Sequence, residues 1–91
     1  MNNSANNSTN TPINKILIAN RGAIAKRIMR TIKELGKYSI AVYADDDLDS
    51  KHIDAADQAI SLGAGNVSET YINQQKILQI ALETGADAIH P

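Results

Sequence analysis

Short aliphatic runs alternate with segments of helical periodicity along most of this 91-residue chain. Residues 15–19, 38–44, 58–62 and 87–90 are rich in aliphatic side chains, with two Tyr in the second run, and predict strands. Residues 23–35, about 50–56 and 73–84 predict helices between them. Strands that alternate with helices form βαβ units on a parallel sheet, with right-handed connections. We therefore predict an α/β, Rossmann-like parallel sheet of about four strands with flanking helices, in the order 3-2-1-4.

Apolar spacing and end signals define the two longer helices. In the first, the apolar residues at helical spacing are Ile24, Ile28, Ile32 and Leu35. Gly36 is placed to end that helix. In the second, the apolar residues are Ile77, Ile80, Ala81 and Leu82. Asn73 predicts its N-cap and Gly85 its end, and Asp49 or Ser50 could cap the short helix through Ala56.

The two ends of the chain bound the predicted domain. Residues 1–12, MNNSANNSTNTP, have too few apolar side chains to build a core, and we predict a disordered tail. Residues 13–91 then suffice for one small domain. The fourth strand comes last, with no helix after it, whereas parallel sheets are covered on both faces. We therefore expect a domain that is incomplete at its C-terminus.

Composition narrows the classes of partner. The net charge is −1 and the only aromatic residues are three Tyr, which argues against nucleic-acid binding. No apolar run is long enough to span a bilayer, so we expect no membrane partner. The chain has no Cys, and its first residues lack the features of a secretory signal or an Arg-rich transit peptide. The expected location is cytoplasmic.

The first strand–helix junction, Asn20-Arg21-Gly22, is the place where a doubly wound sheet would meet a ligand. It holds one Gly, where a dinucleotide-binding fingerprint needs three. Asp45 follows the second strand about where a ribose-binding acid would lie. The residues alone leave two interpretations open, a simple turn and a nucleotide site.

The acidic residues and the two histidines do not match the pattern of a metal site or a catalytic site. The acidic cluster consists of Asp45, Asp46, Asp47 and Asp49, but an EF-hand starting at Asp45 would need Gly and Glu where Ser50 and Ala56 stand. Capping of the following helix explains the carboxylates, so we predict no metal site. His52 and His90 have no Ser or Cys nucleophile placed beside them in a recognisable arrangement, and we assign no catalytic residue. His52 is predicted to be structural.

Five motifs occur in order along residues 15–91: IANRG, AVY before an acidic turn, K-H-x-x-x-A-D, S-E-T-Y-I-N and G-A-D-A-I-H-P. In this combination the chain resembles the start of biotin carboxylase domains. The resemblance implies a Rossmann-like first domain of an ATP-grasp enzyme that carboxylates biotin with bicarbonate. Ala23 stands where most of the family has Glu, and RGAIA looks more like the urea carboxylase (urea amidolyase) branch.

The resemblance also implies which parts this chain would supply. ATP, Mg and biotin belong to the parent enzyme, and their contacts lie in segments after Pro91, so we predict that this chain alone binds none of them. Its expected partners are the remaining ATP-grasp domains, the biotin carrier domain and a second copy in a homodimer. The residues expected in one wall of the active site are Asn20, Arg21, Gly22 and His90.

Arg27, Arg30 and Glu34 share one side of the first helix. One interpretation is a solvated surface; the other, which the resemblance implies, is a subunit interface with reciprocal ion pairs across a two-fold axis. The alternatives to an enzyme scaffold are a free-standing Rossmann-like nucleotide-binding module and a non-catalytic interaction domain that uses the Arg27 surface.

Overall fold

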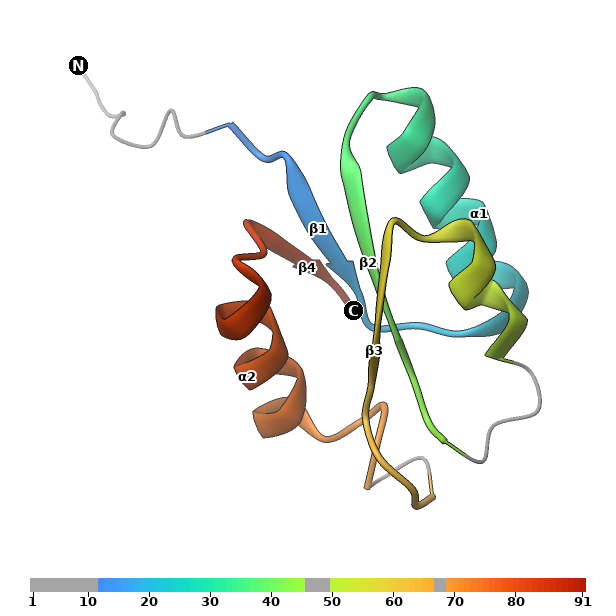
Figure 1. Cartoon of the computed structure of the whole chain (residues 1–91), viewed down its shortest axis with the longest axis vertical. Coiled ribbons are helices and arrows are strands. Elements are labelled where there is room, and N and C mark those ends of the chain that lie inside the picture. The colour runs from blue at the N-terminus through green and yellow to red at the C-terminus, as the bar shows by residue number, and fades with distance from the viewer. Residues whose placement is uncertain (1–11, 46–49, 67–68) are drawn as a thin grey trace.

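A computed structural model describes residues 12–45, 50–66 and 69–91, and these form a four-stranded parallel sheet with helices on both faces (Figure 1). The strands are β1 (Lys15–Ile18), β2 (Tyr38–Tyr43), β3 (Gln58–Ser61) and β4 (Ala88–His90). The helices are α1 (Gly22–Glu34), the 3-10 helix η2 (Ser50–Ala55) and α2 (Gln74–Thr84). The order is β3-β2-β1-β4 with all pairings parallel, which confirms the predicted fold class and topology.

The direction of each crossover determines which face of the sheet a helix covers. The connections from β1 to β2 and from β2 to β3 run the same way across the sheet, so right-handed crossovers place α1 and η2 on one face. The connection from β3 to β4 runs back past β1, which places α2 on the other face (Figure 1). The strand order therefore reverses between β1 and β4. No helix in the described ranges has the length and apolar character needed to cross a bilayer.

The sheet separates two hydrophobic clusters. The cluster on the α2 face consists of Leu17, Ile40, Val42, Leu62, Ile77, Ile80 and Ala81. The cluster on the α1 face consists of Ile18, Ala25, Met29, Ile32 and Ala41. Successive strand residues point to opposite faces, so β1 contributes Leu17 to one cluster and Ile18 to the other, both fully buried.

The buried stripe of α1 differs from the one predicted. Ala25, Met29 and Ile32 are buried, whereas Ile24 is 57% exposed and Leu35 is 66% exposed. The helix is rotated so that the small Ala25 side chain faces the sheet, in the same cluster as Ala41. Apolar spacing alone could not distinguish the observed rotation of α1 from the predicted one. The predicted stripe and the observed stripe overlap, because both contain Ile28 and Ile32.

In α2 the prediction was right for Ile77, Ile80 and Ala81 and wrong for Leu82, which is 83% exposed. Leu78, four residues earlier, is 55% exposed. The two residues lie one turn apart and form a second apolar stripe along α2, beside the buried one. Both side chains are more than half exposed.

The predicted helix ends are confirmed where the structure describes them. The Asn73 side chain accepts a hydrogen bond from the Lys76 N–H, as an N-cap does. Gly36 and Gly85 adopt left-handed φ values of 72° and 73° at the ends of α1 and α2. Asp49 and residues 1–11 of the predicted tail lie outside the described residues. Pro12 is described and exposed.

Asp87 joins the start of β1 to the segment before β4. Its Oδ2 accepts hydrogen bonds from the Asn14 N–H at 3.0 Å and from the Lys15 N–H at 2.9 Å. These two backbone donors stabilise the ionised carboxylate and, with the nearby Lys15 charge, lower the pKa of Asp87 below its ordinary value of 3.8. The carboxylate thereby helps to set the register of β4 beside β1.

Acid should weaken this contact. Because folding lowers the pKa of Asp87, its contribution to stability is fully present above 3.8 and is lost as the pH falls through the lower pKa of the folded state. We expect Asp87→Asn to reduce the free energy of unfolding at about pH 7 and to have a smaller effect at about pH 3. Urea unfolding followed by circular dichroism measures the effect at both pH values, with Asp54→Asn at an exposed position of η2 as the control. An effect of Asp87→Asn that does not change with pH would contradict the assignment.

Candidate active-site wall

The carboxyl ends of β1 and β4 meet at the point where the strand order reverses, which is where open α/β sheets bind ligands. Ile18, the last residue of β1, pairs with His90, the last residue of β4. The structure therefore places all four residues of the predicted wall at one edge of the sheet: Asn20, Arg21 and Gly22 follow β1, and His90 ends β4.

Backbone and side-chain hydrogen bonds fix the first part of the turn after β1 to the end of β4. The Ala19 N–H donates to the His90 carbonyl oxygen at 2.8 Å. The Asn20 side-chain Nδ2 donates to the Pro91 carbonyl oxygen at 2.7 Å. The His90 side chain is exposed, with its Nδ1 3.1 Å from the same Pro91 oxygen. Asn20 is thus tied to a segment 71 residues away in the chain.

Arg21 occupies the N-cap position of α1 without using its side chain as a cap. A cation at a helix N-terminus is electrostatically unfavourable, and the first turn of α1 holds no acidic residue. The Arg21 guanidinium instead lies over the ring of Tyr71, with Cζ 5.6 Å from the ring centroid. The Tyr71 hydroxyl in turn accepts a hydrogen bond from the Ala44 N–H at 3.1 Å, at the end of β2. Tyr71 therefore connects the Arg21 guanidinium to the sheet.

Gly22 begins α1 with a left-handed φ of 65°, a conformation that side chains with a Cβ rarely adopt. Its N–H, one of the orphan donors of the helix N-terminus, donates to Nδ1 of His52 at 3.3 Å. His52 is fully buried in η2, and its Nε2 lies 2.9 Å from the Val42 carbonyl oxygen. A carbonyl oxygen can only accept, so Nε2 carries the proton, and Nδ1 accepts as a neutral imidazole.

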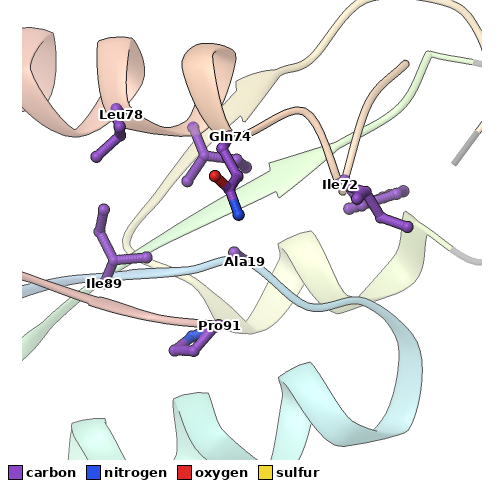
Figure 2. Close-up of a pocket in the computed structure, with 8 residues that line it drawn as sticks. Ala19, Ile72, Gln74, Leu78, Ile89 and Pro91 are labelled. Carbon is purple, nitrogen blue, oxygen red and sulfur yellow. The ribbon is translucent and has the colours of Figure 1, made fainter. Parts of the chain in front are cut away.

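A pocket of about 410 Å³ lies beside this edge, on the α2 face of the sheet. Figure 2 shows Leu78 of α2 and Ile89 of β4 facing each other across it, with Gln74 extending toward Ala19. The remaining lining residues are Tyr71, Ile72, Ile77 and Pro91. The lining is mostly apolar, and none of its side chains is cationic.

The residues of the acidic cluster that the structure describes do not form a metal site. Asp45 accepts a short hydrogen bond from the Ser61 hydroxyl, which joins the ends of β2 and β3. Asp46, Asp47 and Asp49 lie outside the described residues. Among the residues that the structure describes, no three His, Asp or Glu side chains come close enough together to share a metal ion.

The second predicted set, Arg27, Arg30 and Glu34, lies apart from this edge on the exposed surface of α1. Their spacing puts them on one side of the helix, next to the exposed Ile24 and Leu35. The structure thus groups the seven predicted residues into two separate sites. One is the turn beside β4, and the other is the outer surface of α1.

Sequence reasoning missed the contribution of Tyr71 and treated His52 as a helix residue without a defined contact. Both lie within the motifs quoted above, S-E-T-Y-I-N and K-H-x-x-x-A-D. Their contacts with residues 21 and 22 cross 50 and 30 positions of sequence, and no periodicity could reveal such contacts. The motifs were the only available signal.

Comparison with known proteins decides the family. The model of the family described as "Biotin carboxylase, N-terminal domain" matches residues 12–91. The chain belongs to the biotin carboxylase family. This confirms the resemblance seen in the sequence motifs.

Relatives of this biotin carboxylase N-terminal domain are large proteins. The chain is 48% identical over 79 residues to methylcrotonoyl-CoA carboxylase subunit alpha, mitochondrial, of Mus musculus, covering 87% of this chain and 11% of that protein. It is 49% identical over 77 residues to biotin carboxylase 2 of Bacillus subtilis (strain 168), covering 85% and 17%. The crystal structure of Kluyveromyces lactis urea carboxylase matches with a TM-score of 0.79 at 47% identity, covering 84% of this chain and 7% of that one.

Removing the Tyr71 hydroxyl should destabilise this biotin carboxylase domain. Tyr71→Phe keeps the ring beneath Arg21 but leaves the buried Ala44 N–H without its acceptor, and we expect a loss of about 1–2 kcal/mol in the free energy of unfolding. Tyr71→Leu also removes the aromatic ring and should cost more. Urea unfolding of the wild type, Tyr71→Phe and Tyr71→Leu measures the differences in their free energies of unfolding. A Tyr71→Phe variant as stable as the wild type would refute the importance of the Ala44 contact.

Proposed function

We propose that this domain is the N-terminal scaffold of an ATP-dependent biotin carboxylase, an enzyme that carboxylates biotin with bicarbonate. The observation that supports the proposal most directly is the family match across residues 12–91. The chain spans 11% to 17% of the curated relatives described above, so most of the enzyme would lie in other domains. Its own contribution is one wall of the active site, made by Asn20, Arg21, Gly22 and His90.

ATP, Mg and biotin belong to the parent enzyme in this proposal, and the described residues do not fit an ATP site by themselves. The turn after β1 has one Gly and no P-loop Lys-Ser/Thr pair. The adjacent pocket has Gln74 and Tyr71 as its polar side chains, and the Tyr71 hydroxyl already accepts from Ala44. Phosphate binding relies strongly on cations, and no side chain in this lining is a cation.

The outer side of α2 is the surface that we assign to contact with the ATP-grasp domains. Leu78 and Leu82 form an exposed stripe there, and Ile72, which lines the same pocket as Leu78, is exposed as well. Exposed apolar patches of this kind mark interaction surfaces, and the large relatives imply that further domains adjoin this one. The biotin carrier domain would approach the same enzyme as a separate partner.

A homodimer through α1 is the second assembly that we propose. Arg27, Arg30 and Glu34 are exposed and lie beside Ile24 and Leu35, so the surface combines apolar anchors with charges of both signs. A two-fold axis across α1 would bring the Arg side chains of one copy to Glu34 of the other. This composition fits a subunit interface better than a purely solvated helix surface.

Our assignment of the chain to a branch of the family is based on Ala23. The sequence RGAIA around this residue resembles the urea carboxylases. Identities of 47% to 49% to the three relatives named above do not separate urea from acyl-CoA carboxylases. On the basis of Ala23, we propose that urea is the final carboxyl acceptor of the enzyme. Carboxylase assays with urea and with acyl-CoA substrates test it directly.

The isolated chain should not bind MgATP tightly. We expect no measurable heat when MgATP is titrated into residues 1–91, and no bicarbonate-dependent ATP hydrolysis with free biotin. A longer protein that includes the ATP-grasp domains should show both. Micromolar binding by the chain alone would instead favour a free-standing nucleotide-binding module.

Charge reversal on α1 should weaken the proposed dimer of the full carboxylase. We expect Arg30→Glu to shift the enzyme toward monomer in sedimentation velocity, because it places like charges opposite one another. Adding Glu34→Arg to the same chain should restore part of the dimer, since the pairs between positions 30 and 34 re-form with their signs exchanged while Arg27 keeps its charge. Ala64→Glu in the exposed loop after β3, outside both helices, is the control. A dimer unchanged by Arg30→Glu would remove the α1 interface.

A further inference from the structure

The buried imidazole of His52 is the one buried ionisable side chain that the described core contains. It lies in η2, between the N-terminus of α1 and the end of β2. Its Nδ1 accepts from the Gly22 N–H and its Nε2 donates to the Val42 carbonyl oxygen. Both ring nitrogens are therefore committed to backbone groups, one of which belongs to the proposed active-site wall.

Packing alone does not require a histidine at this position. A buried aliphatic side chain would fill the space between α1 and β2 without the cost of burying two polar atoms. Arg21, the N-cap residue, makes no side-chain cap, so the imidazole supplies the acceptor that the first N–H of α1 needs. Gly22 has a left-handed φ, and a Cβ placed on it would meet no atom within 4 Å, so no neighbouring group packs against this backbone position.

We propose that His52 is a positioning residue of the carboxylase. Its Nδ1, by accepting from the Gly22 N–H, fixes the backbone that presents Asn20 and Arg21 to the active site. Asn20 is held by Pro91 and Arg21 lies over Tyr71, so the hydrogen bond to Gly22 is the third anchor of this turn. The inference rests on the proposed function, since it gives the turn a role in catalysis.

Two substitutions separate the two hydrogen bonds of the ring. The side-chain oxygen of Asn in His52→Asn falls near the position of Nδ1 and can accept from Gly22. The longer side chain in His52→Gln reaches the position of Nε2 and can donate to Val42. The Asn side chain is smaller and leaves the larger void, so packing makes His52→Asn the less stable variant or, at best, an equal one.

Activity should follow the opposite order from stability. In the full carboxylase, we expect kcat/KM for bicarbonate-dependent ATP hydrolysis to be on the order of tenfold lower in His52→Gln than in His52→Asn, because misplaced active-site groups lose rate steeply. Melting temperature, measured on the same samples, should be equal or higher for His52→Gln. Ile32→Val, which loosens the core at the far end of α1, controls for destabilisation and should retain the wild-type kcat.

Hydrogen exchange gives a second measurement that does not depend on activity. Exchange in residues 20–25 should be faster in His52→Gln than in His52→Asn. If His52→Gln does not fold, His52→Asn still decides: its exchange in residues 20–25 should match the wild type, and faster exchange there would overturn the proposal.

Equal kcat/KM in the two variants, or activity that simply follows melting temperature, would also overturn the positioning role. A wild-type enzyme without bicarbonate-dependent ATP hydrolysis is a different result. It would refute the proposed function, and with it this inference, before any variant is compared.

Discussion

β1 is the strand on which the rest of the domain depends. It pairs with β2 on one side and with β4 on the other, and it sends Leu17 and Ile18 into the two opposite clusters with no exposure. Burying apolar surface on both faces of one strand forces helices onto both faces of the sheet. The reversal of strand order beside β1 then opens the edge where the wall residues lie.

Rigidity at that edge comes from contacts distant in sequence. The turn after β1 is held by Pro91, by the Tyr71 ring and by the buried His52 imidazole, each from a different part of the chain. A turn anchored in this way is suited to hold its side chains in fixed positions, as a preorganised site requires. It also explains how a domain with no nucleotide-binding fingerprint could still contribute to an active site.

The two helical layers divide the remaining surface between two partners in the proposed enzyme. α1 buries one stripe on the sheet and exposes a mixed surface of Arg, Glu, Ile and Leu. α2 buries Ile77, Ile80 and Ala81 and leaves Leu78 and Leu82 more than half exposed. Each helix therefore has one face buried in the core and one exposed face with apolar side chains, which would suit a small domain that contacts others within a larger protein.

The sequence by itself determined the element types, the strand order and the family. Aliphatic runs, helix caps such as Asn73 and ordered motifs are local properties, and right-handed crossovers leave few topologies. It also predicted which four residues share the edge, because carboxyl ends of parallel strands must meet there. Only the tertiary structure decided the rotation of α1, which exposes Ile24 and Leu35, and the exposure of Leu82. It alone revealed that His52 and Tyr71 hold the turn, since such contacts depend on how separate elements pack, and packing is not encoded in the spacing of neighbouring residues.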